Sequence, residues 1–202
     1  MARALRRTAG TVVVMFGAGL LTYAGVTYAS GAIARDRARS AWDAAEARAA
    51  IVAVEARLAA AVPTLIVPPG APVARLVLPR LGLDEIVVEG IGDAELNAGP
   101  GHLPGSVLPG ERGNAVISAH RDRHFHALDR VSVGDTVVTE TLRERVVWRI
   151  AERKVVARGV PALWETSGPT LTLTTCWPVR YFGSAPDRLL LTAVPLARTR
   201  RA

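Results

Sequence analysis

The hydrophobic pattern begins with a long uncharged run. Residues 9–34 contain no charged side chain, and the centre of the run, 11–21, is strongly apolar. A helix needs about 20 such residues to cross a bilayer, and three arginines precede the run, which favours a cytoplasmic N-terminus. The pattern predicts a tail and a single transmembrane anchor over residues 1–34. A cleaved signal peptide is the alternative, because residues 29–31 are small, but its apolar region spans only about 7–15 residues.

The next segment has a helical pattern. Residues 36–61 hold neither glycine nor proline, and Ile51, Val54 and Leu58 recur at helical spacing. We therefore expect a helical stalk over residues 35–62. The prolines and the glycine of residues 63–72 indicate a stiff, extended linker and a domain boundary.

From residue 73 to residue 196 the pattern changes to short apolar runs of β type, separated by Gly, Pro and Asp. Such spacing is typical of a closed or nearly closed β-barrel or of a sandwich. Short helices are predicted at 93–97 and 124–129, and a basic tail at 197–202. The expected strands are 74–78, 85–88, 115–118, 136–140, 146–151, 154–157, 171–175 and 189–194.

Composition and charge narrow the class of protein. Half of the residues are hydrophobic and only 5% are aromatic, so the core is expected to be aliphatic. The net charge of +7 owes most of its excess to six arginines within the first seven and last five residues. Charges that flank a membrane segment suit anionic lipid headgroups. With no zinc-finger or RNA-binding motif present, we expect no nucleic-acid partner.

The single cysteine carries the candidate chemistry. Cys176 ends a Thr-rich strand pattern, and a lone cysteine has no partner for an intramolecular disulfide. A free cysteine thiol ionises near pKa 8.5, so a reactive thiol needs positive charge nearby. His120 and Arg188 are the candidates, and the gap from Cys176 to Arg188 suits two neighbouring strands joined by a loop. Taken singly, each has a structural alternative: a buried thiol, a loop histidine and a strand-edge arginine.

Four motifs together resemble the sortases, the membrane-anchored cysteine transpeptidases of bacteria, and in particular the class D and the Gram-negative (class GN) sortases. The resemblance covers 73–196 and implies an all-β fold, the closed eight-stranded sortase barrel. The motifs are Gly-Pro-Gly-His-Leu-Pro-Gly at 99–105, His-Arg-Asp at 120–122, Thr-Leu-Thr-Thr-Cys-Trp-Pro at 172–178 and Asp-Arg-Leu-Leu-Leu at 187–191.

The resemblance also implies an activity. Cys176 is the expected nucleophile, His120 the general acid and base, and Arg188 the group that holds the substrate or stabilises the oxyanion. The expected partners are an exported protein with a C-terminal Leu-Pro-x-Thr-Gly-like sorting signal and an amine acceptor on the cell envelope. Thr175, Trp177 and His124 are the expected substrate-binding residues. The chemistry requires no cofactor.

Two departures and three alternatives accompany this prediction. Ala119 stands where the family usually has glycine before the histidine, and the loop 179–183 is individual to this chain. The same residues also suit a thiol hydrolase, in which water replaces the amine, or a membrane-tethered binding module without activity. A zinc site formed by the histidines at 120, 124 and 126 with Asp122 matches no metal-binding spacing.

Overall fold

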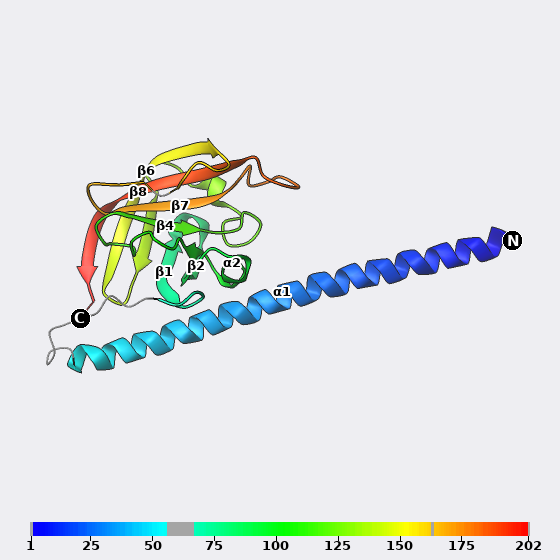
Figure 1. The fold of residues 1–202 in the computed structure, drawn as a ribbon, viewed down its shortest axis with the longest axis horizontal. Coiled ribbons are helices and arrows are strands. Elements are labelled where there is room, and N and C mark those ends of the chain that lie inside the picture. Colours follow the sequence, from blue (N-terminus) through cyan, green and yellow to red (C-terminus); the bar gives the residue numbers. More distant parts are fainter. Residues whose placement is uncertain (1, 56–66, 163, 202) are drawn as a thin grey trace.

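The computed structural model describes residues 2–55, 67–162 and 164–201, which form one long helix and a β-barrel (Figure 1). The helices are α1 (Ala2–Glu55) and α2 (Asp93–Ala98), with 3-10 turns at Pro79–Leu81 and Leu128–Arg130. The strands are β1 (Pro72–Leu78), β2 (Leu83–Glu89), β3 (Gly101–His102), β4 (Asn114–Ser118), β5 (Thr136–Glu140), β6 (Glu144–Ala157), β7 (Thr170–Trp177) and β8 (Asp187–Arg200).

The strands close into one barrel in the order β1-β2-β3-β4-β7-β8-β6-β5, and β5 pairs with β1. The pairs β2–β3 and β4–β7 are parallel, and the others are antiparallel. The predicted closed eight-stranded barrel is therefore confirmed.

Two of the expected strands were assigned wrongly. The runs 146–151 and 154–157 belong to one strand, β6, because the polar residues between them still pair with β8 across a register shift at Ile150/Glu152. The missing eighth strand is β3, whose two residues include a glycine and carry no β pattern. The correct number of strands therefore arose from two compensating errors.

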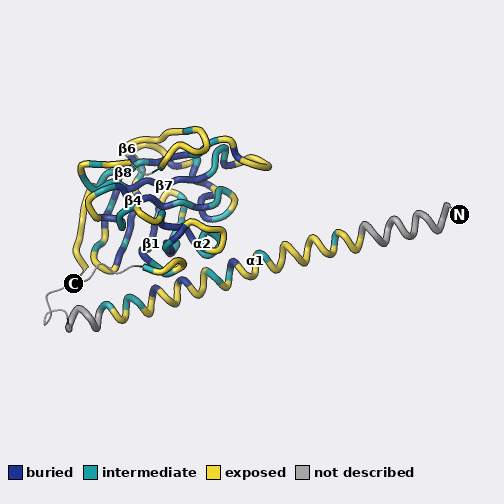
Figure 2. The backbone as a smooth tube through the Cα atoms, viewed as in Figure 1, coloured by how far each residue is buried: buried dark blue, intermediate teal, exposed yellow. Residues whose placement is uncertain are grey.

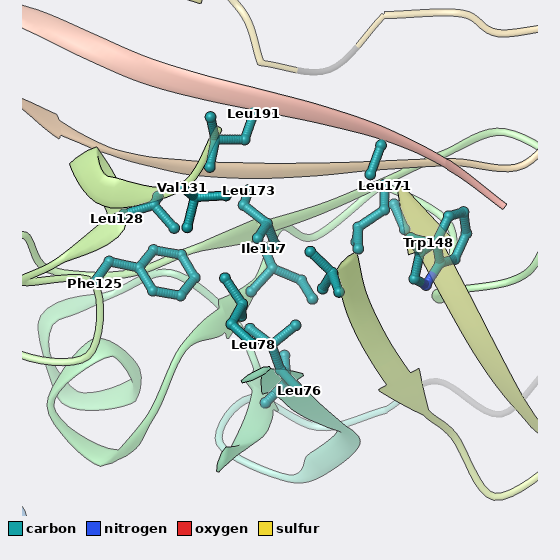
Figure 3. Close-up of a cluster of buried hydrophobic side chains, with 14 of the residues drawn as sticks. Leu76, Leu78, Ile117, Phe125, Leu128, Val131, Trp148, Leu171, Leu173 and Leu191 are labelled. Atoms are coloured by element: carbon teal, nitrogen blue, oxygen red, sulfur yellow. The ribbon is translucent and has the colours of Figure 1, made fainter. Parts of the chain in front are cut away.

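The barrel interior is mostly aliphatic, as its composition predicts. Buried side chains from β1, β4, β7 and β8 meet in the centre, and Phe125 and Trp148 are the bulky aromatic members (Figure 3). The Trp148 indole N–H donates to Thr139 Oγ1 at 2.8 Å, so its polar atom is satisfied inside the core. This packed core is the rigid support for the site.

Helix α1 runs along the outside of the barrel, past β1, β2 and α2 (Figure 1). Ala38 and Trp42 are buried against Ile86 and Val88 of β2, whereas most of the other α1 residues between Val14 and Ala49 are exposed (Figure 2). Over the part of the chain that the structure describes, no helix combines the length and the apolar character needed to cross a membrane.

The helix expected over residues 35–62 is present as far as Glu55. Residues 56–62, with residues 63–66 of the expected linker, lie outside the described residues. The helix at 93–97 is confirmed as α2. The helix at 124–129 is wrong: this segment forms turns followed by the 3-10 turn, because the amides of Arg123 and Phe125 both donate to the His120 carbonyl oxygen.

The last strand is longer than the sequence suggested. β8 continues past residue 196 and pairs with β6 as far as Arg200. Arg198 Nη2 donates to both carboxylate oxygens of Glu144, at 2.9 and 2.8 Å, which ties this extension to the start of β6. The residues expected as a basic tail are thus largely part of the ladder.

Candidate active site

The ladder between β7 and β8 places Cys176 directly opposite Arg188. Residues that face each other across an antiparallel pair lie on the same side of the sheet, with Cβ atoms about 4.5–5.5 Å apart. Both side chains are half-buried, and the thiol is free. The expectation that the two residues lie side by side on neighbouring strands is confirmed.

His120 is held at the same end of the barrel by the other neighbour of β7. Strand β4 runs parallel to β7 and pairs Ser118 with Thr174. The Ala119 amide donates to the Thr174 carbonyl oxygen at 3.2 Å, and Thr175 Oγ1 donates to the Ala119 carbonyl oxygen at 2.7 Å. These contacts hold the segment that bears His120 against β7 at the end of that strand where Cys176 lies.

Thr175 therefore has a structural contact. Its side chain is buried and its hydroxyl group is engaged by Ala119. A role of Thr175 in substrate binding stays a prediction, but its hydrogen bond ties the segment that bears His120 to β7 one residue before Cys176. The methyl group of Ala119 is buried without a positive φ, so alanine fits where glycine is usual.

Arg188 keeps donors available for a ligand. Its Nη1 donates to the Asp187 carbonyl oxygen at 2.8 Å. Among the described residues, no carboxylate lies within ion-pair distance of its guanidinium. A half-buried cation with free N–H groups opposite a thiol is suited to stabilise an oxyanion.

The other two expected substrate-binding residues lie in different surroundings. Trp177 ends β7, half-buried, with the Arg153 guanidinium 5.2 Å from its ring centroid. His124 is buried, with Nδ1 3.4 Å from Glu85 Oε1, and it lines a cavity of about 340 Å³ between α1 and the barrel. Neither Cys176 nor Arg188 lines that cavity, so burial favours a structural role for His124.

The metal alternative finds no support in the geometry. Within residues 2–55, 67–162 and 164–201, no three His, Cys, Asp or Glu side chains converge as a possible metal site. His126 is exposed, with Nδ1 2.6 Å from the Arg123 carbonyl oxygen, whereas the His124 ring is buried against β2. The two rings thus have separate partners.

One residue of the site escaped the sequence-based prediction. Arg121, which directly follows the histidine, donates to carbonyl oxygens of the loop between β7 and β8. Its only signal in the sequence is its place next to His120, because the contacts join residues far apart along the chain.

A closed barrel that presents a lone cysteine opposite an arginine, with a histidine just beyond the neighbouring strand β4, defines the class as sortase-like. Residues 76–196, more than half of the chain, match the family model described as sortase domain. The chain therefore belongs to the sortase family, whose members are cysteine transpeptidases. The resemblance to class D sortases is consistent with the relatives.

These relatives are known sortases. Sortase D of Bacillus subtilis (strain 168) is 30% identical over 118 residues, a match that covers 57% of this chain and 60% of that protein. The structure of a Clostridium perfringens sortase D5 transpeptidase superposes with a TM-score of 0.59 at 25% identity, covering 65% of this chain and 82% of the other. Sortase C1 of Streptococcus agalactiae gives 0.58 at 29% identity, covering 63% and 69%.

Proposed function

We propose that this chain is a cysteine transpeptidase that cleaves a C-terminal Leu-Pro-x-Thr-Gly-like sorting signal and transfers the new acyl group to an amine on the cell envelope. The observation that carries the proposal is the pairing of Cys176 with Arg188 across β7 and β8. The hydrogen bonds from Ala119 and Thr175 support the same assignment, because they fix the segment that bears His120 against β7.

The first half-reaction forms a thioester. The Cys176 sulfur attacks the scissile carbonyl carbon, and the carbonyl oxygen becomes an oxyanion that the Arg188 guanidinium stabilises. When the C–N bond breaks, His120 gives a proton to the departing amine. The acyl group is then held on sulfur by a C–S bond.

The second half-reaction returns the enzyme to its starting state. The acceptor amine attacks the thioester carbon and gives a proton to His120, and the C–S bond breaks to release the thiolate. If water attacks in place of the amine, the same residues perform hydrolysis. Access of water to the thioester therefore decides between transferase and hydrolase.

The decisive test compares the full-length chain with its Cys176→Ala variant. Both are incubated with a pool of sorting-signal peptides and hydroxylamine, and the products are identified by mass spectrometry. We expect a peptide hydroxamate with the parent chain and at least about a 10³-fold loss with Cys176→Ala, because a thioester needs a thiol and the sequence has a single cysteine. Equal melting temperatures show that the variant is folded.

The alternatives give other products. A free carboxylic acid without hydroxamate identifies a hydrolase. No cleavage by a chain whose thiol is readily alkylated supports a binding module, and so does any function that survives Cys176→Ala.

We also propose that the N-terminal segment, residues 1–34, anchors the enzyme in the membrane with the barrel outside the cytoplasm. The uncharged run 9–34 supports this, as do the exposed apolar side chains between Val14 and Tyr28. The full-length chain is then expected to stay with membranes in alkaline carbonate, and replacement of Phe16 and Leu20 by aspartate is expected to release it. Release of the parent chain by carbonate alone contradicts the anchor.

A further inference from the structure

Arg121 joins the turn after His120 to the loop between β7 and β8. Its Nη1 donates to the Pro178 carbonyl oxygen at 3.1 Å, and its Nη2 donates to the Gly183 carbonyl oxygen. Its guanidinium carbon lies 5.5 Å from the ring centroid of Tyr181, within the range of a cation–π contact. One side chain thus contacts both ends and the middle of the loop segment 178–183.

The tip of this loop, residues 180–184, makes few contacts apart from those with Arg121. Val179 and Ala185 are buried near its two ends, but the residues between them are exposed, and Phe182 is fully exposed. Among the described residues, the other side-chain hydrogen bond to the tip joins Arg158 Nη1 to Ser184 Oγ at 3.2 Å, on the exposed surface. The tip therefore depends on Arg121 for its position.

The loop matters because of what it connects. It leaves β7 just after Cys176 and enters β8 just before Arg188, while Arg121 is covalently next to His120. The loop is therefore joined to the ends of both strands and, through Arg121, to the turn that follows His120. Effects of misplaced groups on catalysis are large, about 10²-fold for a displacement near 1 Å.

We propose that Arg121 is a positioning residue that fastens the β7–β8 loop to the His120 turn and so keeps the three reactive groups in one arrangement. The inference rests on the transpeptidase function proposed above. A planar guanidinium has rigidly directed N–H groups that reach two carbonyl oxygens at once. A lysine ammonium keeps the charge but lacks this fork, so it is expected to substitute only in part.

The experiment uses the full-length chain and its variants Arg121→Gln and Arg121→Lys. Arg180→Gln is the matched control, because Arg180 is an exposed arginine of the same loop and its loss changes the charge equally. We measure kcat and KM for peptide transfer, and the rate of chymotrypsin cleavage after Tyr181 and Phe182. Thermal unfolding reports global stability.

We expect Arg121→Gln to lower kcat about 10²-fold while KM changes less than about threefold. Arg121→Lys is expected to fall between the parent and Arg121→Gln. Cleavage of the loop should become about tenfold faster in Arg121→Gln at a nearly unchanged melting temperature, because only local opening is affected. Arg180→Gln should resemble the parent in both assays.

The proposal is overturned if Arg121→Gln keeps the parent kcat and cleavage rate, if Arg180→Gln loses as much as Arg121→Gln, or if the loss follows a lowered melting temperature. Loop cleavage does not depend on catalysis, so a parent chain without transfer activity refutes the proposed function only. In that case faster cleavage in Arg121→Gln alone still supports the fastening of the loop, and equal cleavage rates refute it.

Discussion

Two of the four histidines, His102 and His120, lie on adjoining parts of the barrel wall, and their surroundings are opposite. The His102 ring, on β3, is buried, with Nδ1 2.6 Å from Glu89 Oε2 and Nε2 2.8 Å from Ser106 Oγ. The His120 ring, after β4, is half-buried, and within the described residues no hydrogen bond to it is formed. Both ring nitrogens of His102 have hydrogen-bond partners, whereas the ring nitrogens of His120 remain available to bond a substrate.

The His102 cluster has the composition of a serine–histidine–glutamate triad but not its chemistry. His102 Nε2 also lies 3.0 Å from the Val107 carbonyl oxygen, which only accepts, so this nitrogen bears hydrogen and takes none from Ser106. The Ser106 hydroxyl donates to the Leu103 carbonyl oxygen at 2.8 Å. The cluster therefore holds the loop after β3 in place.

The comparison teaches that residue identity alone does not mark a reactive group. A buried network whose donors and acceptors are all paired stabilises the fold, whereas half-buried groups with unused donors are available for catalysis. Substitutions in the active site should therefore lower activity with little effect on stability, and substitutions in the His102 cluster should lower stability with little effect on activity.

The largest effect is expected at Arg188. Arg188→Gln removes the cation opposite the thiol, and kcat should fall about 10²–10³-fold, the usual cost of losing an oxyanion donor. Stability should change little, because the side chain is half-exposed. Peptide transfer kinetics with urea unfolding test both parts, and Arg149→Gln, an exposed arginine on β6, is the control. Activity within about threefold of the parent contradicts the role of Arg188.

The sequence carried enough information to predict that Cys176 and Arg188 lie together. Cys176 and Arg188 are separated by a short loop between two strongly patterned strands, and alternation along such strands fixes which residues meet. Their pairing in the ladder confirms the expectation. The helix of the stalk was equally predictable, because its pattern is local.

Strand β3 and the contacts of Arg121, which support the site, were not predictable from the sequence. Strand β3 exists only because Gly101 and His102 bridge β2 and β4, and a Cβ on Gly101 would lie 2.1 Å from the Gly90 carbonyl oxygen. The contacts of Arg121 with the β7–β8 loop join residues far apart in sequence. Such contacts depend on barrel closure, which no local pattern specifies.

The next largest effect is expected at His102, on stability. His102→Gln leaves the half-buried Glu89 carboxylate without its close partner, which should lower the free energy of unfolding by about 2–3 kcal/mol. The folded fraction should keep kcat within about threefold of the parent, since the ring touches none of the reactive groups. Urea unfolding and kinetics at low temperature measure the two quantities.

Ser106→Ala serves as the milder companion variant. It removes a hydroxyl group that bonds His102 and Leu103, and a loss of about 0.5–1.5 kcal/mol is expected. If His102→Gln instead abolishes activity at unchanged stability, the division between the two histidines is wrong.

The smallest effect is expected at the exposed ion pair of Arg75 and Asp84. Water screens the attraction between these two charges more than it screens the buried contacts of His102. Arg75 Nε and Nη2 lie 2.8 and 2.6 Å from the two oxygens of Asp84, and this hydrogen bonding lowers the pKa of Asp84 below its ordinary 3.8. The folded state therefore binds fewer protons than the unfolded chain, so the stabilisation is present above the ordinary pKa and is lost as pH falls through the lowered value.

The difference in melting temperature between the parent and Asp84→Asn should accordingly be small at neutral pH and should shrink as the pH falls below the ordinary pKa of 3.8. It should also shrink with added salt, because both side chains are more than one-third exposed, at 41% and 44%. Asp122→Asn, at an exposed carboxylate without such a partner among the described residues, is the control and should show no such trend. A difference in melting temperature that is independent of pH would mean that Asp84 acts through its shape rather than its charge. Screening by water would then not explain why the exposed pair contributes less than the buried His102 cluster.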